Sequence, residues 1–103
     1  MKYKILGKTG IEVSELCMGT MSFGGHADEK ESAKMFNQCR EAGINFFDCA
    51  NVYDIGKSET ILGKLISGSR NDLVITSKVY FPTSNDVNAR GNTRKNIMNS
   101  INQ

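Results

Sequence analysis

The sequence has few of the residues and patterns that mark specialised classes of protein. It contains no tryptophan, one proline and one histidine among 103 residues. No apolar run approaches the roughly 20 residues that a transmembrane helix needs, and the first residues lack the apolar stretch of a signal peptide. The net charge is +2 without a basic block, so nucleic-acid or membrane-surface binding is not indicated. Composition and length predict one small globular domain.

The three cysteines, Cys17, Cys39 and Cys49, form no recognisable metal or redox pattern. Their spacing matches neither a zinc ribbon nor a Cys-x-x-Cys pair, so no metal site is expected. Each lies in an apolar stretch, and we expect three small buried side chains in a reducing cytoplasm. A catalytic thiol would need a nearby histidine, and only His26, in a glycine-rich loop, is available as the alternative.

The start of the chain has the pattern of a β-hairpin followed by a short strand. Residues 3–6 and 11–13 alternate apolar and polar side chains around a turn that contains Gly7 and Gly10. Residues 15–19 form a short apolar run that ends in glycine, which predicts a buried strand. Residues 20–25 then form a loop with two adjacent glycines.

Helical and strand patterns alternate through the rest of the chain. Asp28 and Glu31 form a capping-box signature for a helix over residues 29–42, with Gly43 at its C-terminal end. The remaining elements are expected at residues 44–48 (strand), Ser58 to Gly68 (helix capped by Ser58), 73–78 (strand), 82–92 (polar loop) and from Thr93 (a last helix). Strands that alternate with amphipathic helices predict a parallel α/β sheet that is covered on both faces.

Polar side chains follow the predicted parallel strands at the ends where α/β folds bind ligands. Asp48 ends one strand, Tyr53 lies five residues later, and Lys78 ends the next strand. A lysine ammonium beside a phenol favours the phenolate, and a nearby carboxylate keeps that lysine charged. The three residues therefore predict a tyrosine general acid that gives a proton to a carbonyl oxygen while a hydride reaches the carbon.

Each of these residues also has an ordinary structural interpretation. Asp48 could cap a turn, Tyr53 could pack on the rim of the sheet, and Lys78 could be a solvated charge at a strand end. Lys78 could equally serve as a Schiff-base lysine. The pair Gly24–Gly25 is neither a dinucleotide fingerprint nor a Walker loop. Spacing alone leaves these alternatives open.

Several motifs, in order along the chain, resemble the N-terminal part of the aldo-keto reductase superfamily. They are YKILGKTGIEVS (3–14), MGTMSFGG (18–25), GINFFDCANVY (43–53), Ser58-Glu59 with Leu62-Gly63, and TSKV (76–79). The branch they resemble most comprises bacterial reductases similar to the β subunits of voltage-gated potassium channels. The resemblance implies an α/β fold: the N-terminal part of a (β/α)8 TIM barrel, with a hairpin that closes its bottom and about three βα units of eight.

The resemblance also implies a reaction and roles for named residues. Members of the superfamily reduce aldehydes and ketones with NADPH, so the expected partner is a small-molecule carbonyl substrate. Tyr53 matches the proton donor, Lys78 matches the lysine that activates it, and Asp48 matches the carboxylate paired with that lysine. The positions beside the nicotinamide of NADPH are matched by Gly19, Thr20, Met21 and Asp48.

Two positions near this site depart from the family pattern or match it loosely. Cys49 stands where threonine is more common, a change that should not affect the chemistry. His26 falls where some members contact the cofactor, although an ordinary histidine in a surface loop is the favoured interpretation. The resemblance predicts neither the identity of the substrate nor the oligomeric state.

The resemblance further implies that a whole reductase is longer than this sequence. A fourth catalytic residue, a histidine, and the basic loop that grips the 2′-phosphate of the cofactor would both lie beyond Gln103. We therefore expect residues 1–103 to be a partial reductase domain that is inactive and poorly folded, or associated, in isolation. A regulatory β-type subunit that keeps the fold without turnover is the alternative.

Overall fold

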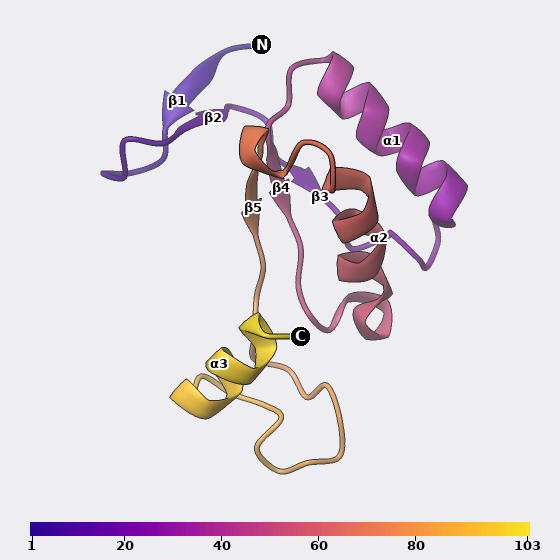
Figure 1. The fold of residues 1–103 in the computed structure, drawn as a ribbon, viewed down its shortest axis with the longest axis vertical. Coiled ribbons are helices and arrows are strands. Elements are labelled where there is room, and N and C mark those ends of the chain that lie inside the picture. The colour runs from indigo at the N-terminus through magenta and orange to yellow at the C-terminus, as the bar shows by residue number, and fades with distance from the viewer.

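A computed structural model of the chain describes all of residues 1–103. It contains a separate hairpin, a three-stranded sheet and three α-helices (Figure 1). In chain order, the elements are β1 (Tyr3–Ile5), β2 (Glu12–Ser14), β3 (Met18–Gly19), α1 (Glu29–Glu41), β4 (Phe46–Asp48), the 3-10 helix η1 (Tyr53–Gly56), α2 (Lys57–Ile66), the 3-10 helix η2 (Arg70–Asp72), β5 (Val74–Thr76) and α3 (Arg94–Ile101). Strands β3, β4 and β5 are thus each followed by a helix, which makes three βα units.

The three-stranded sheet is parallel and has the order β3-β4-β5, which confirms the predicted sheet. Gly19 pairs with Asp48, and Asp48 pairs with Thr76, so the carboxyl ends of all three strands lie in one row. Strand β3 is shorter than predicted, because it pairs with β4 only over Met18 and Gly19. Residues 15–17 are exposed and run from the hairpin to the sheet.

The core lies between one face of the sheet and the helices α1 and α2, which both cover that face (Figure 1). Its buried residues are Phe36, Ile44, Phe47, Cys49, Leu62, Ile66 and Leu73. The rings of Phe36 and Phe47 are 5.0 Å apart between centroids, and Phe47 is fully buried. Alternation along β4 turns Phe46 and Asp48 to the opposite face, where both are only half-buried. The prediction of two covered faces is therefore confirmed for one face only.

Helix α1 begins and ends at the predicted signals. The side chain of Asp28 accepts a hydrogen bond from the backbone N–H of Glu31 at 2.8 Å, as an N-cap should. Gly43 follows the helix with φ +87°, a left-handed conformation that glycine adopts without steric cost. The Tyr3 hydroxyl donates to the carbonyl of Gly43 at 2.7 Å, which attaches the hairpin to the end of α1.

Helix α2 begins differently from the prediction. Its first residue is Lys57, after Gly56 at φ +84°, and no side chain caps it. Ser58 lies inside the helix and is fully buried, so the expectation that it caps the helix was wrong. Its hydroxyl points into the protein and donates to the carbonyl of Thr20 at 2.7 Å. Because the Ser58 hydroxyl makes this interior hydrogen bond, it does not cap the helix.

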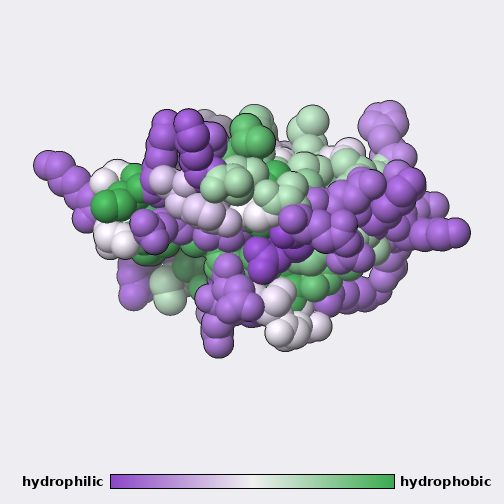
Figure 2. Space-filling model, turned by 90° about the horizontal axis from the view of Figure 1, so that it is seen from above, coloured by the Kyte–Doolittle hydropathy of each residue, from purple (hydrophilic) through white to green (hydrophobic).

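Apolar side chains are exposed at both ends of the molecule. On the hairpin side, large exposed residues are Met1, Tyr3, Ile5, Ile11 and Leu16. Figure 2 views the molecule from this end and shows green, hydrophobic surface interleaved with purple, hydrophilic side chains. At the other end, Val87, Met98 and Ile101 are exposed.

Helix α3 begins where the sequence predicts it. Thr93 caps this helix by accepting a hydrogen bond from the N–H of Asn96 at 3.1 Å. No helix combines the length and hydrophobicity needed to cross a bilayer.

Candidate active site

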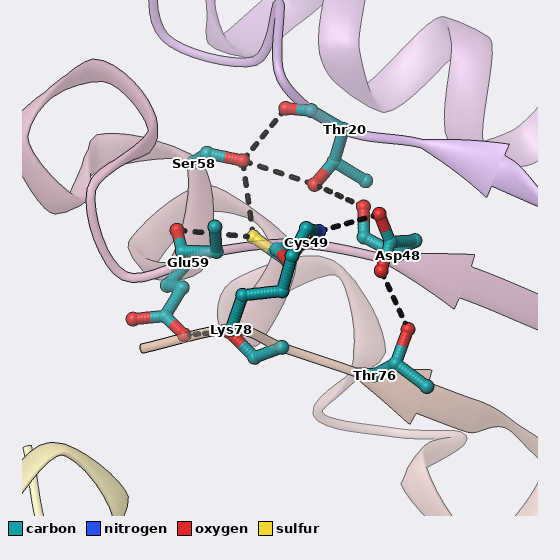
Figure 3. Close-up of polar contacts among 9 residues, drawn as sticks. Thr20, Asp48, Cys49, Ser58, Glu59, Thr76 and Lys78 are labelled. Atoms are coloured by element: carbon teal, nitrogen blue, oxygen red, sulfur yellow. Dashed lines mark hydrogen bonds and ion pairs between the residues drawn. The ribbon is translucent and has the colours of Figure 1, made fainter. Parts of the chain in front are cut away.

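The structure brings together the three residues predicted to do chemistry. Asp48 ends β4, Lys78 lies just after β5, and η1 begins at Tyr53. The Nζ atom of Lys78 lies 2.6 Å from Oδ2 of Asp48 and 4.9 Å from the centroid of the Tyr53 ring. Figure 3 shows the Asp48 and Lys78 side chains at the rim formed by the strand ends. Their separation is that of a strong, charge-assisted hydrogen bond.

Both partners of this ion pair are fixed by further hydrogen bonds. Lys78 also donates to the carbonyl of Cys49 at 2.6 Å. The other carboxylate oxygen of Asp48, Oδ1, accepts from the hydroxyl of Thr76 at 2.7 Å. Thr76 was not singled out from the sequence. The spacing could have indicated Thr76, because it lies two residues before Lys78 at the end of a strand and alternate residues along a strand share a face.

The ion pair shifts the pKa values of both groups away from their ordinary values. Partial burial would raise the pKa of Asp48, but hydrogen bonds from Lys78 and Thr76 outweigh it and lower this pKa. Desolvation would lower the pKa of Lys78, but Asp48, together with Tyr53, outweighs it and raises this pKa. Lys78 is therefore held as a cation over the Tyr53 ring. A Schiff-base lysine must be neutral to attack, so this arrangement argues against that alternative.

A buried hydroxyl and thiol network lies under the rim (Figure 3). Thr20 is fully buried, and its hydroxyl donates to the backbone carbonyl of Asp48 at 3.1 Å. Ser58 Oγ lies 3.0 Å from Thr20 Oγ1 and 3.3 Å from Cys49 Sγ. The network joins β3, β4 and α2. The Thr20 side chain, predicted to lie beside a cofactor, thus supports the framework of the rim.

Gly19 and Met21, the other predicted cofactor positions, are open to solvent. The Met21 side chain is 68% exposed. A Cβ atom built at Gly19 would meet nothing within 4 Å, so there is free space beside the end of β3. Gly19 is also the residue that pairs with Asp48 across the sheet. These two positions therefore leave room for a ligand next to the ion pair.

Two further contacts hold the segment that carries Lys78. Ser77 donates from its hydroxyl to Oε1 of Glu59 at 2.5 Å, which ties this segment to α2. The backbone N–H of Asn51 donates to the carbonyl of Lys78 at 3.1 Å. Ser58-Glu59 belongs to the motifs of the family resemblance, but no local pattern predicts the bond between Glu59 and Ser77.

The cysteines and the histidine do not form a second site. Cys49 is buried and Cys39 is half-buried, but Cys17 is exposed, so the expectation of three buried cysteines was wrong for Cys17. Cys17 lies in the stretch between the hairpin and the sheet, which is not packed. Partial burial and the charge of Asp48 raise the pKa of its thiol, which disfavours a nucleophilic thiolate. His26 is exposed in its loop.

A cavity lies beside this site and does not include it. It measures about 730 Å³ and is bordered by the start of α2, the loop over residues 82–92 and α3. Neither Asp48, Tyr53 nor Lys78 lines it. The Asp48–Lys78 ion pair with the adjacent Tyr53 ring, rather than this cavity, is therefore the candidate active site.

Comparisons with known proteins agree with this architecture. The model of the Aldo/keto reductase family matches residues 15–103. The uncharacterized oxidoreductase YrpG of Bacillus subtilis is 44% identical over 91 residues, which cover 82% of this chain and 28% of that protein. A probable voltage-gated potassium channel subunit beta of Arabidopsis thaliana is 41% identical over 104 residues, covering 95% of this chain and 31% of that protein.

A solved structure gives the same result for the fold. The holo form of aldo-keto reductase AKR11C1 from Bacillus halodurans is 34% identical, with a TM-score of 0.72 over 84% of this chain and 29% of that one. The present chain thus spans less than a third of the length of these relatives. Its hairpin and three βα units are those of the N-terminal part of the (β/α)8 barrel. The chain belongs to the aldo/keto reductase family.

Proposed function

We propose that residues 1–103 supply the proton donor of an NADPH-dependent reductase of aldehydes and ketones. One observation carries the proposal: a lysine ammonium, fixed at 2.6 Å by Asp48, lies 4.9 Å from the centre of the Tyr53 ring. Lys78 is held by a carboxylate and a backbone carbonyl at once. We infer that this cation stabilises negative charge that develops on the Tyr53 oxygen.

In the proposed reaction, the Tyr53 hydroxyl gives its proton to the carbonyl oxygen of the substrate. The substrate carbon gains a hydride, the carbon–oxygen π electrons move to oxygen, and the product is an alcohol. The charge left on the Tyr53 oxygen is stabilised by the Lys78 ammonium, and Asp48 keeps that ammonium charged and in place. Tyr53 then regains a proton from solvent.

The residues present fit the nicotinamide end of the cofactor. Gly19 leaves open space at the rim, Met21 offers an exposed apolar side chain, and the Asp48 side chain keeps 36% of its surface exposed. We assign these three residues to hold the nicotinamide and its ribose beside Tyr53. When bound, NADPH would supply the hydride.

Replacement of Tyr53 by phenylalanine tests the proposal, because it removes only the hydroxyl. We would measure turnover in a completed barrel, defined as residues 1–103 joined to the remaining C-terminal part of the Bacillus subtilis relative. Loss of a general acid costs about 10²- to 10⁴-fold in rate, so Tyr53→Phe should abolish most NADPH oxidation and leave NADPH binding intact.

Tyr80→Phe is the matched control, since Tyr80 is exposed and its ring contacts Phe81 rather than Asp48, Tyr53 or Lys78. It should keep the turnover of the unmodified completed barrel. Equal turnover in Tyr53→Phe and Tyr80→Phe would overturn the proposal.

The similarity to the Arabidopsis protein favours a second proposal, that of a regulatory β-type subunit that senses the cofactor. Such a protein keeps the rim but does not need rapid turnover. A completed barrel that binds NADPH and oxidises it no faster than its own Tyr53→Phe variant would favour this second proposal.

A further inference from the structure

The turn directly after Tyr53 has an unusual backbone conformation. Asp54, Ile55 and Gly56 are three consecutive residues in the left-handed region, with φ values of +47°, +56° and +84°. Glycine adopts this region freely and aspartate tolerates it, but for a β-branched residue such as Ile55 it is an outlier. The Ile55 side chain is 92% exposed, so its own packing does not compensate. Contacts made by neighbouring residues must hold the turn.

Asp54 makes such contacts with the loop that follows β3. A Cβ atom built at Gly24 would lie 3.2 Å from Oδ2 of Asp54, and one built at Gly25 would lie 3.6 Å from its Cγ. Oδ2 is buried and accepts no hydrogen bond, and Nζ of Lys57 lies 3.8 Å from it as its counter-charge. The carboxylate thus lies too close for a side chain at position 24 to fit without a shift, whereas a Cβ atom at position 25 would make ordinary van der Waals contact.

Gly24 also approaches the start of α2. A Cβ atom built there would lie only 2.7 Å from Cβ of Lys57 and 3.3 Å from Cδ1 of Ile61, and Gly24 itself has φ +84°. Any larger residue would push the loop and the helix apart. Gly24, which belongs to no phosphate-binding motif, therefore has a different explanation: the absence of a side chain there lets the backbone of the loop after β3 pack against Asp54 and the start of α2.

The position of Tyr53 depends on this contact more than the position of Lys78 does. Lys78 is fixed separately, by Asp48 and by the carbonyl of Cys49. Tyr53 is followed at once by the left-handed turn, whose first residue, Asp54, lies against Gly24. A change in the turn should therefore move the Tyr53 ring relative to a stationary Lys78 ammonium.

We propose that Asp54 is a positioning residue: by packing against Gly24, it holds Tyr53 beside Lys78. The proposal rests on the proposed function in one respect, namely that Tyr53 is the proton donor. This contact between Asp54 and Gly24, here called the interlock, is a property of the two loops and can be measured without catalysis.

The first test is an NMR measurement on the completed barrel. The Lys78 side-chain protons near the Tyr53 ring should show a ring-current shift, and Tyr53→Leu sets the value without the ring. Asp54→Gly removes the carboxylate and relieves the left-handed backbone, and it should lose most of that shift. Gly24→Ala should give the same loss from the other side of the contact.

Gly63→Ala is the matched control. Gly63 is exposed in α2, and a Cβ atom there would meet nothing within 4 Å, so this variant should keep the full shift. A full ring-current shift in Asp54→Gly or in Gly24→Ala would overturn the proposal, because either result would show that Tyr53 keeps its place without the interlock.

The second test measures the turnover of the same variants in the completed barrel. A small misplacement of a reacting group lowers kcat by about 10- to 100-fold, so Asp54→Gly and Gly24→Ala should lower kcat by this factor and leave KM for NADPH unchanged. Unchanged kcat in both variants would overturn the positioning role. Retained turnover in Tyr53→Phe would instead overturn the proposed function, and the ring-current result would still stand.

Discussion

The first two βα units and the third differ in how their helices are packed. Helices α1 and α2 bury Phe36, Leu62 and Ile66 against Phe47 of the central strand. Helix α3 has a proper N-cap, but Ile101 on it is 71% exposed and its one buried residue is Asn96. A local signal is therefore sufficient to specify a helix, whereas burial of its apolar face depends on neighbouring elements.

The candidate active site lies at the boundary between these two regions. Asp48 and Tyr53 belong to the second, well-packed unit, and Lys78 belongs to the third. The third unit is held there by polar contacts: Lys78 with Asp48, and Ser77 with Glu59. The rim is thus kept together by hydrogen bonds and charge at the point where apolar packing ends.

The largest expected effect on stability comes from removing the central aromatic residue of the packed region. Phe47→Ala should lower the free energy of unfolding by about 3–5 kcal/mol, because it leaves a cavity where a fully buried ring stood. Urea unfolding followed by circular dichroism measures this change. Ile101→Ala, in the third unit, should be nearly neutral, and a similar loss in both variants would contradict the contrast between the two regions.

A smaller effect is expected at the helix caps. Asp28→Ala removes the cap of α1 and should lower the free energy of unfolding by about 1 kcal/mol, because α1 is part of the packed core. Thr93→Ala removes the equivalent cap of α3. It should speed amide exchange within α3 while leaving the urea midpoint in place. A shift of the midpoint in Thr93→Ala as large as that in Asp28→Ala would show that α3 unfolds together with the core.

The smallest effect concerns the pH dependence of the ion pair. The Asp48 pKa is lowered from 3.8, so its stabilising contribution is lost as pH falls through the lowered value. The Lys78 pKa is raised from 10.5, so its contribution is lost as pH rises through the raised value. Between these limits the contribution should be constant, and for side chains 36% and 49% exposed it should not exceed about 1 kcal/mol.

Lys78→Met provides the comparison for this prediction. It should weaken the loss of stability below pH 3.8 that Asp48 causes, because the lysine that lowers the Asp48 pKa is gone. Unfolding free energies measured from pH 2 to 7 in both proteins would show the difference. Identical acid profiles would mean that the ion pair does not contribute to stability.

Much of the fold follows from local sequence signals. The helix caps at Asp28 and Thr93 and the parallel sheet are where the sequence predicts them. Ser58 was misassigned as a cap because its hydroxyl bonds to Thr20, a partner 38 residues away that no local pattern reveals. The predicted length of β3 was too great for a similar reason: the strand extends only where it pairs with β4, over Met18 and Gly19.

In the candidate site, too, some features could be predicted from the sequence and others could not. The meeting of Asp48 and Lys78 follows from a general rule, that parallel strands end at one edge of a sheet. The left-handed turn at Asp54 and Ile55 could not be foreseen, because isoleucine disfavours that conformation. Thr76 and Ser77 support the site through hydrogen bonds whose partners, Asp48 and Glu59, lie in other elements.

The central claim is that Tyr53 and Lys78 act as one unit, and a double-mutant cycle in the completed barrel tests it most directly. Turnover would be compared for Tyr53→Phe, Lys78→Met and the combined variant. Groups that act together give strongly non-additive losses, so the account predicts that the combined variant is as slow as Tyr53→Phe alone. Losses that multiply in the combined variant would contradict the account, because they would show that Lys78 contributes independently of Tyr53.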